Sequence, residues 1–238
     1  MLSKNQIKFI TSLKQKKYRT AHKLFVVEGV KGIKELLKSN LKLHTLYTTK
    51  SFNNSDVQEV LIDNKDLKRI SFLTTPNTAL AVFEMPEPQD IVYNKLILAL
   101  DDVRDPGNLG TIIRLCDWFG ITELICSMET VDCYNPKVVQ ATMGSITRVN
   151  ITYTNLERFL GCINTPILGA FMDGTNVYKT TLPDVGVLVM GNEANGISKP
   201  IENVISRKVS IPRFGALQAT ESLNVATATA ILLSEFKR

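Results

Sequence analysis

Asn108 and Arg114 lie in a predicted turn and the helix that follows it, where an amide and a guanidinium could contact a ligand. The apolar run 96–100 leads into the turn sequence Asp-Pro-Gly-Asn, which ends at Asn108, and a helical pattern follows as far as Gly120. Arg114 lies off the apolar stripe of that helix, within about two turns of its start. Both side chains could project towards a sheet edge, although a capped helix with a solvated arginine is the more common outcome.

Two further loops carry an acid, a hydroxyl and a second amide. A buried apolar run stops at Gly191, two residues before Glu193. That acid could serve a site or merely cap the next helix. After the apolar run that ends at Pro212, Ser222 and Asn224 begin a helix rich in small residues. The ordinary interpretation of Ser222 is that it is the N-cap of this helix.

The residues after the proline-containing stretch 85–95 predict the kind of sheet that would position these loops. Short, continuous apolar runs alternate there with helical patterns, which is typical of a parallel sheet covered on both faces. Ligands bind such sheets at the carboxyl ends of the strands, where all three loops fall. No G-x-G-x-x-G or Walker sequence occurs, which disfavours ordinary dinucleotide and nucleoside triphosphate binding.

The first part of the chain predicts a small α/β domain over residues 1–88, followed by the ligand-binding domain over 89–238. The expected elements are a basic amphipathic helix over 3–16, a strand over 24–29, a helix from Val30, a strand over 43–49, a helix over 56–63 capped by Ser55, a strand over 70–75 and a helix that begins near Pro76.

Positive charge is concentrated at one end of the chain. Residues 1–50 contain 12 lysines and arginines and two acids, a net charge of +10, whereas the remaining residues carry −5. This asymmetry is expected of a segment that meets a polyanion, and equally of a solvated helix face that keeps the protein soluble.

Composition excludes several other classes of protein. No apolar run is long enough for a transmembrane helix, so no membrane partner is expected. The four cysteines form no C-x-x-C pair and only two histidines are present, which predicts reduced thiols, a cytoplasmic protein and no metal site.

Together, in this order and spacing, the three loops resemble the three motifs of the SpoU (TrmH-like) RNA methyltransferases of the SPOUT class. The matching residues are Asn108, Gly110 and Arg114 in the first motif, Gly191, Asn192, Glu193 and Gly196 in the second, and Ile211, Pro212, Glu221, Ser222, Leu223, Asn224 and Val225 in the third. Asn135-Pro136-Lys137 and Met143-Gly144 resemble a further family segment. The resemblance covers residues 95–238, with Arg213 where an apolar residue is common and Ala226 where serine is common.

This resemblance implies an α/β fold with a deep trefoil knot in the C-terminal parallel-sheet domain and a ribosomal-protein-like RNA-binding domain before it. It implies a homodimer with its site across the interface, which transfers a methyl group from S-adenosyl-L-methionine to a ribose 2′-hydroxyl without a metal. Large-subunit ribosomal RNA is the favoured substrate and transfer RNA the alternative. The site residues so implied are Asn108, Arg114, Glu193, Ser222 and Asn224 for catalysis, and Gly169, Ala170, Met190, Gly191, Ile211, Pro212 and Leu223 for the cofactor.

The basic segment supplies the candidate RNA contacts, which are Lys14, Lys16, Lys17 and Arg19. Two other functions stay open at this point. One is a non-catalytic RNA-binding protein with the same fold, which the presence of all three motifs disfavours. The other is an α/β enzyme acting on a small molecule, which the +10 segment and the missing phosphate loops disfavour.

Overall fold

The computed structural model of the chain describes residues 1–52, 57–215 and 222–238. They form two compact units: an N-terminal unit of Met1–Pro88 with Asp132–Thr147, and a C-terminal unit of Gln89–Val131 with Arg148–Arg238. The segment Asp132–Thr147 lies between two strands of the C-terminal unit in the sequence but packs with the N-terminal unit. The two units are therefore interleaved along the chain.

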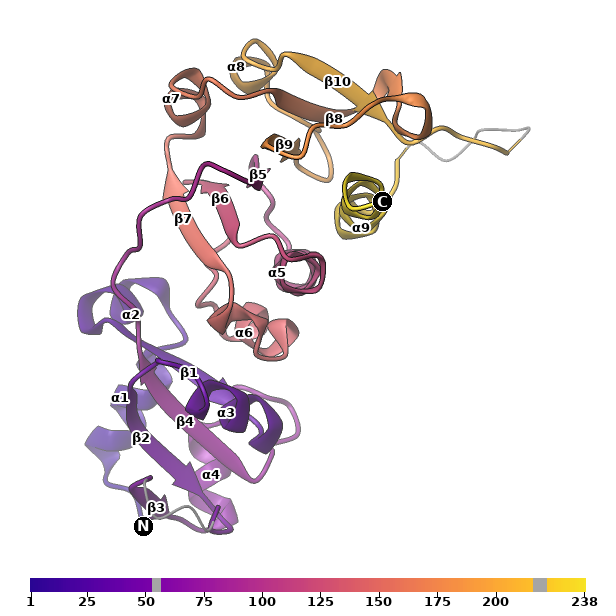
Figure 1. Cartoon of the computed structure of the whole chain (residues 1–238). Helices are drawn as coiled ribbons and strands as arrows, with labels where there is room; N and C mark the ends of the chain where they lie inside the picture. The colour runs from indigo at the N-terminus through magenta and orange to yellow at the C-terminus, as the bar shows by residue number, and fades with distance from the viewer. Residues whose placement is uncertain (53–56, 216–221) are drawn as a thin grey trace. The chain divides into compact units, whose positions relative to one another are not determined.

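The N-terminal unit is built on a four-stranded sheet in the order β1-β4-β2-β3 (Figure 1). Its strands are β1 (Leu24–Glu28), β2 (Leu43–Thr48), β3 (Glu59–Leu61) and β4 (Ala79–Glu84). Its helices are α1 (Lys4–Ser12), α2 (Lys16–His22), α3 (Val30–Leu37), α4 (Asn64–Ile70) and α6 (Pro136–Thr142), with a 3₁₀ turn at Ser145–Thr147. Strand β4 pairs antiparallel with β1 and with β2, and β3 pairs parallel with β2. Helix α6 contacts β1 and is therefore part of this unit.

Strands β1 and β2 and helix α3 confirm their predictions, whereas the helix predicted over 3–16 is confirmed only as far as Ser12. Helix α1 ends at Ser12 and α2 begins at Lys16. The guanidinium of Arg19 accounts for the break, because its Nη1 donates hydrogen bonds to the carbonyls of Leu13 (2.9 Å) and Lys14 (2.8 Å). The carbonyls of Leu13 and Lys14 therefore accept hydrogen bonds from a side chain, and not from backbone amides of a continuing helix.

Three further predictions for the N-terminal unit are wrong. Residues 59–61 form β3 where a helix was expected, and the expected cap Ser55 lies outside the described residues. Residues 71–75 form no strand, because the loop there is held by the side chain of Glu28. The run from Ala79 is β4 rather than a helix, because it pairs on both sides and is buried between β1 and β2. Tertiary pairing here overrides the local pattern.

The C-terminal unit confirms the predicted parallel sheet. Six strands lie in the order β10-β8-β9-β5-β6-β7, and every neighbouring pair is parallel. The strands are β5 (Leu96–Leu100), β6 (Glu123–Ser127), β7 (Asn150–Thr154), β8 (Ile167–Asn176), β9 (Gly186–Met190) and β10 (Arg207–Ser210). The helices are α5 (Pro106–Phe119), α7 (Leu156–Gly161), α8 (Lys199–Glu202) and α9 (Val225–Phe236), with a 3₁₀ turn at Val177–Lys179. Strand β7 had no clear sequence signal because it is a half-buried edge strand.

The strand order places the loops after β5 and β9 next to each other in this unit. From β5 the chain proceeds through β6 to β7 on one side, whereas β8, β9 and β10 lie on the other side. The order therefore switches between β5 and β9, and crevices at such switch points are where open α/β sheets bind ligands. Both strands are fully buried, so the loops that follow them are mounted on the core. The trefoil knot implied by the resemblance stays a prediction.

No helix in the described ranges is long and apolar enough to cross a membrane.

A buried carboxylate, Glu28, ties the loop after α4 to the end of β1. It accepts hydrogen bonds from the Ser71 hydroxyl and from the Phe72 amide, the latter at 2.7 Å. Burial raises the pKa of Glu28 above its ordinary value, and the two hydrogen bonds lower it again in part. The folded state therefore holds a proton on this carboxyl more tightly than the unfolded chain does.

We expect Glu28→Gln to change how stability depends on pH. With the raised pKa, the contribution of Glu28 is most favourable below about pH 4.3 and is lost as the pH rises through the folded-state pKa. The difference in unfolding free energy between wild type and Glu28→Gln, measured by urea titration, should therefore shift against the wild type as the pH rises from about 4.3 through the folded-state pKa. The exposed Glu84→Gln is the control. Parallel pH profiles for wild type and Glu28→Gln would contradict the prediction.

Candidate active site

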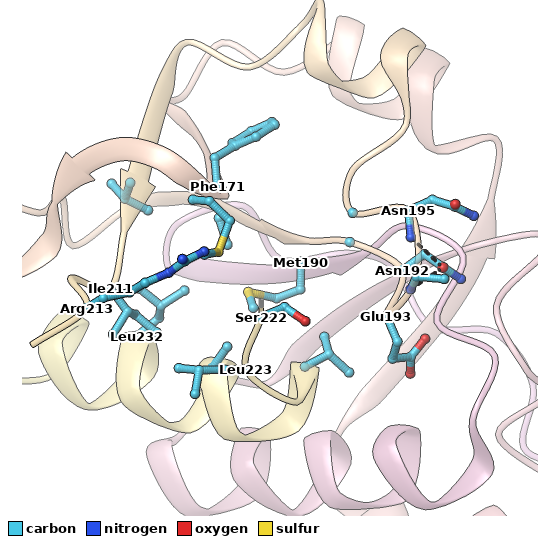
Figure 2. Close-up of a pocket in the computed structure, with 18 of the residues that line it drawn as sticks. Phe171, Met190, Asn192, Glu193, Asn195, Ile211, Arg213, Ser222, Leu223 and Leu232 are labelled. Carbon is cyan, nitrogen blue, oxygen red and sulfur yellow. Dashed lines mark hydrogen bonds between the residues drawn. The ribbon is translucent and has the colours of Figure 1, made fainter. Parts of the chain in front are cut away.

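A cavity of about 1100 Å³ is present in the C-terminal unit. Four segments line it: residues 170–172 of β8, residues 190–196 after β9, residues 209–215 at the end of β10, and residues 222–232, which lead into α9. Figure 2 shows Asn192, Glu193 and Asn195 at one end and Phe171 and Arg213 at the other. The wall between these ends is aliphatic, with side chains that include Met190, Ile211, Leu223 and Leu232. An apolar cavity with a few polar groups is the usual form of a small-molecule site.

Six of the seven residues predicted to bind the cofactor line this cavity. They are Ala170, Met190, Gly191, Ile211, Pro212 and Leu223. The seventh, Gly169, is buried beneath the wall. A Cβ atom on Gly169 would lie 2.4 Å from Ile205 Cδ1 and 2.6 Å from Phe171 Cε2, so glycine is needed there for packing.

The loop after β9 is closed by its own hydrogen bonds. Asn192 and Gly196 exchange two backbone hydrogen bonds of 2.9 Å. The Asn192 side chain donates to the carbonyl of Asp102 (2.6 Å) and accepts from the amides of Ala194 (2.8 Å) and Asn195 (3.1 Å). This side chain therefore fixes the loop to the end of β5, a role that the sequence analysis missed.

Gly191 is required by this loop. A Cβ atom on Gly191 would lie 2.2 Å from the carbonyl carbon of Gly196 and 2.3 Å from the nitrogen of Ile197. The close approach that excludes a side chain is thus to the loop's own backbone. Gly196 has φ +67°, which favours glycine there for a separate, conformational reason.

Three predicted catalytic residues, one from each motif, are joined by hydrogen bonds. Asn224 Nδ2 donates to Asn108 Oδ1 (2.9 Å), and Asn108 Nδ2 donates to Glu193 Oε1 (2.8 Å). We call Asn224, Asn108 and Glu193 the amide relay. It brings together the start of α9, the first turn of α5 and the loop after β9, as the position of these residues at strand ends predicted.

Helix α9 fixes the direction of the amide relay. Asn224 is its N-cap, and Asn224 Oδ1 accepts hydrogen bonds from the amides of Ala226 (3.0 Å) and Thr227 (3.2 Å). The Nδ2 of Asn224 must then face Asn108, which in turn presents its own Nδ2 to the Glu193 carboxylate. The interpretation of Ser222 as the cap is wrong, because Asn224 takes that position and Ser222 lines the cavity. Glu193 likewise caps no helix, since Ser198 is the N-cap residue of α8.

Arg114 is not part of the amide relay within this chain. It lies six residues after Asn108 on α5, which places it about 9 Å further along the helix axis and on a different face. Its side chain is exposed, does not line the cavity, and has no hydrogen-bond or ion-pair partner among the residues that the structure describes. Glu221, the remaining motif residue, lies outside the described residues.

The four predicted RNA contacts separate into two groups. Lys14, Lys16 and Lys17 are exposed on the N-terminal unit. Arg19 is 2% exposed and forms an ion pair with Asp132, so the prediction that it contacts phosphate is wrong. Because Arg19 also binds the carbonyl of Lys14, it shapes the turn that carries the lysines.

Metal ligands do not gather anywhere in the described ranges: no group of three or more His, Cys, Asp or Glu residues could hold an ion there. Burial strongly raises the pKa of the Cys116 thiol. Cys126 and Cys133 are also buried, whereas Cys162 is exposed at the end of α7, away from the cavity lining.

Comparison with known proteins gives matches along both units. Residues 95–234 match the SpoU rRNA Methylase family, and residues 4–81 match the MRM3-like substrate binding domain. The chain is 29% identical to the 23S rRNA (guanosine(2553)-2′-O)-methyltransferase RlmP of Bacillus subtilis, over 97% of this chain and 96% of the relative. It is 35% identical to the 23S rRNA (guanosine-2′-O-)-methyltransferase RlmB of Neisseria meningitidis, over 63% of this chain and 62% of the relative.

Solved structures agree with these matches. A TrmH-family protein from Porphyromonas gingivalis has a TM-score of 0.90 and 40% identity, and the match covers 100% of this chain and 98% of the other. An rRNA methyltransferase from Sinorhizobium meliloti with bound S-adenosylmethionine has a TM-score of 0.86 and 30% identity, over 99% and 95% of the two chains. The chain therefore belongs to the SpoU rRNA methylase family.

Proposed function

We propose that this protein transfers a methyl group from S-adenosylmethionine to the 2′-hydroxyl of a ribose in large-subunit ribosomal RNA. The amide relay beside the cavity carries this proposal, because it aligns residues from all three family motifs at one rim of a cofactor-sized site. The match to a 23S rRNA 2′-O-methyltransferase over nearly the whole of both chains supports the choice of substrate.

The N-terminal unit favours ribosomal RNA over transfer RNA. The Bacillus and Sinorhizobium rRNA enzymes match 97% and 99% of this chain and so include that unit. A TrmH/SpoU tRNA-modifying enzyme from A. aeolicus matches only 60% of this chain, with a TM-score of 0.51 and 27% identity. Transfer RNA remains the second candidate, because that match lies in the same family.

The cavity fits S-adenosylmethionine in size and in chemistry. Its volume of about 1100 Å³ is ample for a ligand of this size. Met190, Ile211 and Leu223 offer an apolar wall for the adenosine, whereas Asn192, Glu193 and Ser222 offer polar groups. The cofactor supplies an electrophilic methyl group, so the protein's part is to position the attacking hydroxyl and to stabilise charge.

Direct attack by the ribose oxygen needs no nucleophile from the protein. Three of the four cysteines are buried, the pKa of Cys116 is strongly raised, and Cys162 does not line the cavity. Glu193, oriented by Asn108, is placed to accept a hydrogen bond from the ribose. The Ser222 hydroxyl is available on the same cavity for a second polar contact.

Arg114 acts on the RNA side of this reaction. A guanidinium stays protonated in proteins, so it serves to bind a phosphate and stabilise the developing alkoxide rather than to remove a proton. We further propose that it does so in the site of a second copy of this chain. Arg114 has no partner among the described residues, and Trp118, one turn further along α5, is 84% exposed. An exposed tryptophan on a helix face is typical of an interface.

The reaction is tested with the full-length protein, tritiated S-adenosylmethionine and RNA from a strain that lacks the gene. Transfer into large-subunit RNA, with the product resistant to alkaline cleavage at one mapped nucleotide, is the expected result. Transfer into transfer RNA alone would move the proposal to its second candidate. Binding of RNA without transfer to either RNA would favour a non-catalytic protein.

Two substitutions of Asn224 separate its capping role from its role in the amide relay. Asn224→Ala should destabilise α9 by about 1 kcal/mol, whereas Asn224→Ser should keep the cap. Both remove the hydrogen bond to Asn108, so both should lower methyl transfer by about tenfold or more. Urea denaturation and tritium transfer are the two measurements. Full activity in Asn224→Ser would contradict the functional role of the relay.

Arg114→Ala should reduce transfer by about 100-fold or more and keep its affinity for S-adenosylhomocysteine within about twofold, since Arg114 does not line the cavity. Arg158→Ala, which removes an exposed arginine on α7, is the control.

Mixing Arg114→Ala with Glu193→Gln subunits tests whether Arg114 acts in the site of a second copy of the chain. A shared site restores activity in mixed dimers because one of their two sites has both residues, whereas a site within one chain gives no recovery.

The exposed lysines should contribute sequence-independent affinity for RNA. The double variant Lys14→Ala, Lys17→Ala should weaken RNA binding and reduce the slope of log affinity against log salt by roughly 0.7 to 0.9 for each phosphate that the protein no longer neutralises. The matched control replaces Lys179 and Lys237, two exposed lysines of the C-terminal unit. Equal reductions in both double variants would mean that the N-terminal lysines act only through net charge.

A further inference from the structure

Strands β8 and β10 pair with a five-residue interruption. Leu168 and Gly169 pair with Arg207 and Lys208, whereas the next residues of β10, Val209 and Ser210, pair with Thr175 and Asn176. Residues 170–174 therefore have no partner on β10, and we call them the β8 bulge. Bulges re-aim side chains and are common beside functional sites. Here the bulge supplies one wall of the cavity, formed by Ala170, Phe171 and Met172.

The two ends of the β8 bulge are held tightly. At its far end, a Cβ atom on Gly174 would lie 2.6 to 2.8 Å from the backbone of Lys208 and Val209. At its near end, Gly169 leaves room for the ring of Phe171, which packs against the core beside Ile197 and Ile205. The residues between these ends have no ladder to hold them and depend on side-chain contacts.

Lys208 makes those contacts. Its ammonium lies 4.4 Å from the centre of the Phe171 ring and 3.9 Å from Asp173 Oδ2, both in the β8 bulge. The same nitrogen donates to Glu202 Oε1 of α8 at 2.6 Å. One cation thus joins the bulge to α8, and α8 follows the loop after β9 with Ser198 as its cap. Lys208 therefore joins one segment that lines the cavity, the β8 bulge, to the helix that follows another, the loop after β9.

The contact between Lys208 and Glu202 favours the charged form of both side chains. The hydrogen bonds from Lys208 and Lys199 lower the pKa of Glu202, and the hydrogen bond to Glu202 raises the pKa of Lys208. The Lys208 side chain is 37% exposed and that of Glu202 is 24% exposed. An ion pair this open to solvent adds little to global stability, so its effect is expected to be local.

We propose that Lys208 is a positioning residue for cofactor binding, which holds the β8 bulge in the form that fits S-adenosylmethionine. The inference rests on the proposed function. Lys208 does not line the cavity and acts through Phe171 and Asp173, which it contacts. Removal of the cation leaves the bulge attached at its two ends and free to vary between them.

The chain offers a matched control for this role. Lys199 also donates to Glu202, at 3.0 Å, but has no contact with the β8 bulge among the described residues. Lys208→Met keeps an unbranched stem over Phe171 and removes the charge, Lys208→Arg keeps the charge, and Lys199→Met removes the other lysine. Hydrogen exchange of residues 170–174 without cofactor, calorimetric binding of S-adenosylhomocysteine, and KM and kcat are measured for all three variants.

Lys208→Met should exchange faster across the bulge, bind S-adenosylhomocysteine about tenfold more weakly and raise KM for S-adenosylmethionine similarly, with kcat within about twofold of wild type. Lys208→Arg should restore these values, and Lys199→Met should leave them unchanged. Unchanged exchange and binding in Lys208→Met, or an equal weakening in Lys199→Met, overturns the inference. A wild-type protein that binds no S-adenosylhomocysteine overturns the proposed function itself, whereas the exchange result judges the positioning of the bulge separately.

Discussion

The geometry of the site depends on the capping of one helix. The first amides of α9 have no partners within the helix, and Asn224 Oδ1 accepts from two of them. Because Asn224 Oδ1 is used for the cap, Asn224 can offer only its Nδ2 as a donor to Asn108 Oδ1. Asn108 is thereby oriented with its own Nδ2 towards the Glu193 carboxylate, to which it donates. Helices α5 and α9 pack together, so the two asparagines stand on one rigid pair of helices.

The sequence predicted the C-terminal unit well because its central strands, β5, β6 and β9, are fully buried. A continuous apolar run such as 96–100 is typical of a strand in the middle of a parallel sheet. The polar residues of the site follow the ends of such strands. Pattern was a poorer guide in the N-terminal unit. Residues 79–84 form a strand because of pairing with β1 and β2, and such distant partners are invisible in a local window.

The sequence could predict those residues of the candidate site that lie in loops at the ends of strands. Residue type alone does not distinguish a charged side chain that faces solvent from one that is paired inside the protein, so the sequence does not reveal that Arg19 pairs with Asp132. The holding role of Asn192 had a weak signal, the Asp101-Asp102 pair directly after β5. Only the fold reveals that the Asn192 amide meets the carbonyl of Asp102.

The placement of Asp132–Thr147 has a consequence for how such a protein can change over evolution. Because this segment packs with the N-terminal unit, the polypeptide passes between the two units three times rather than once. A single recombination or truncation at residue 88 would therefore not remove or exchange the whole N-terminal unit, because Asp132–Thr147 would remain. Any replacement would have to fit the buried face of α6, including Val138 and Val139, as well as the linker.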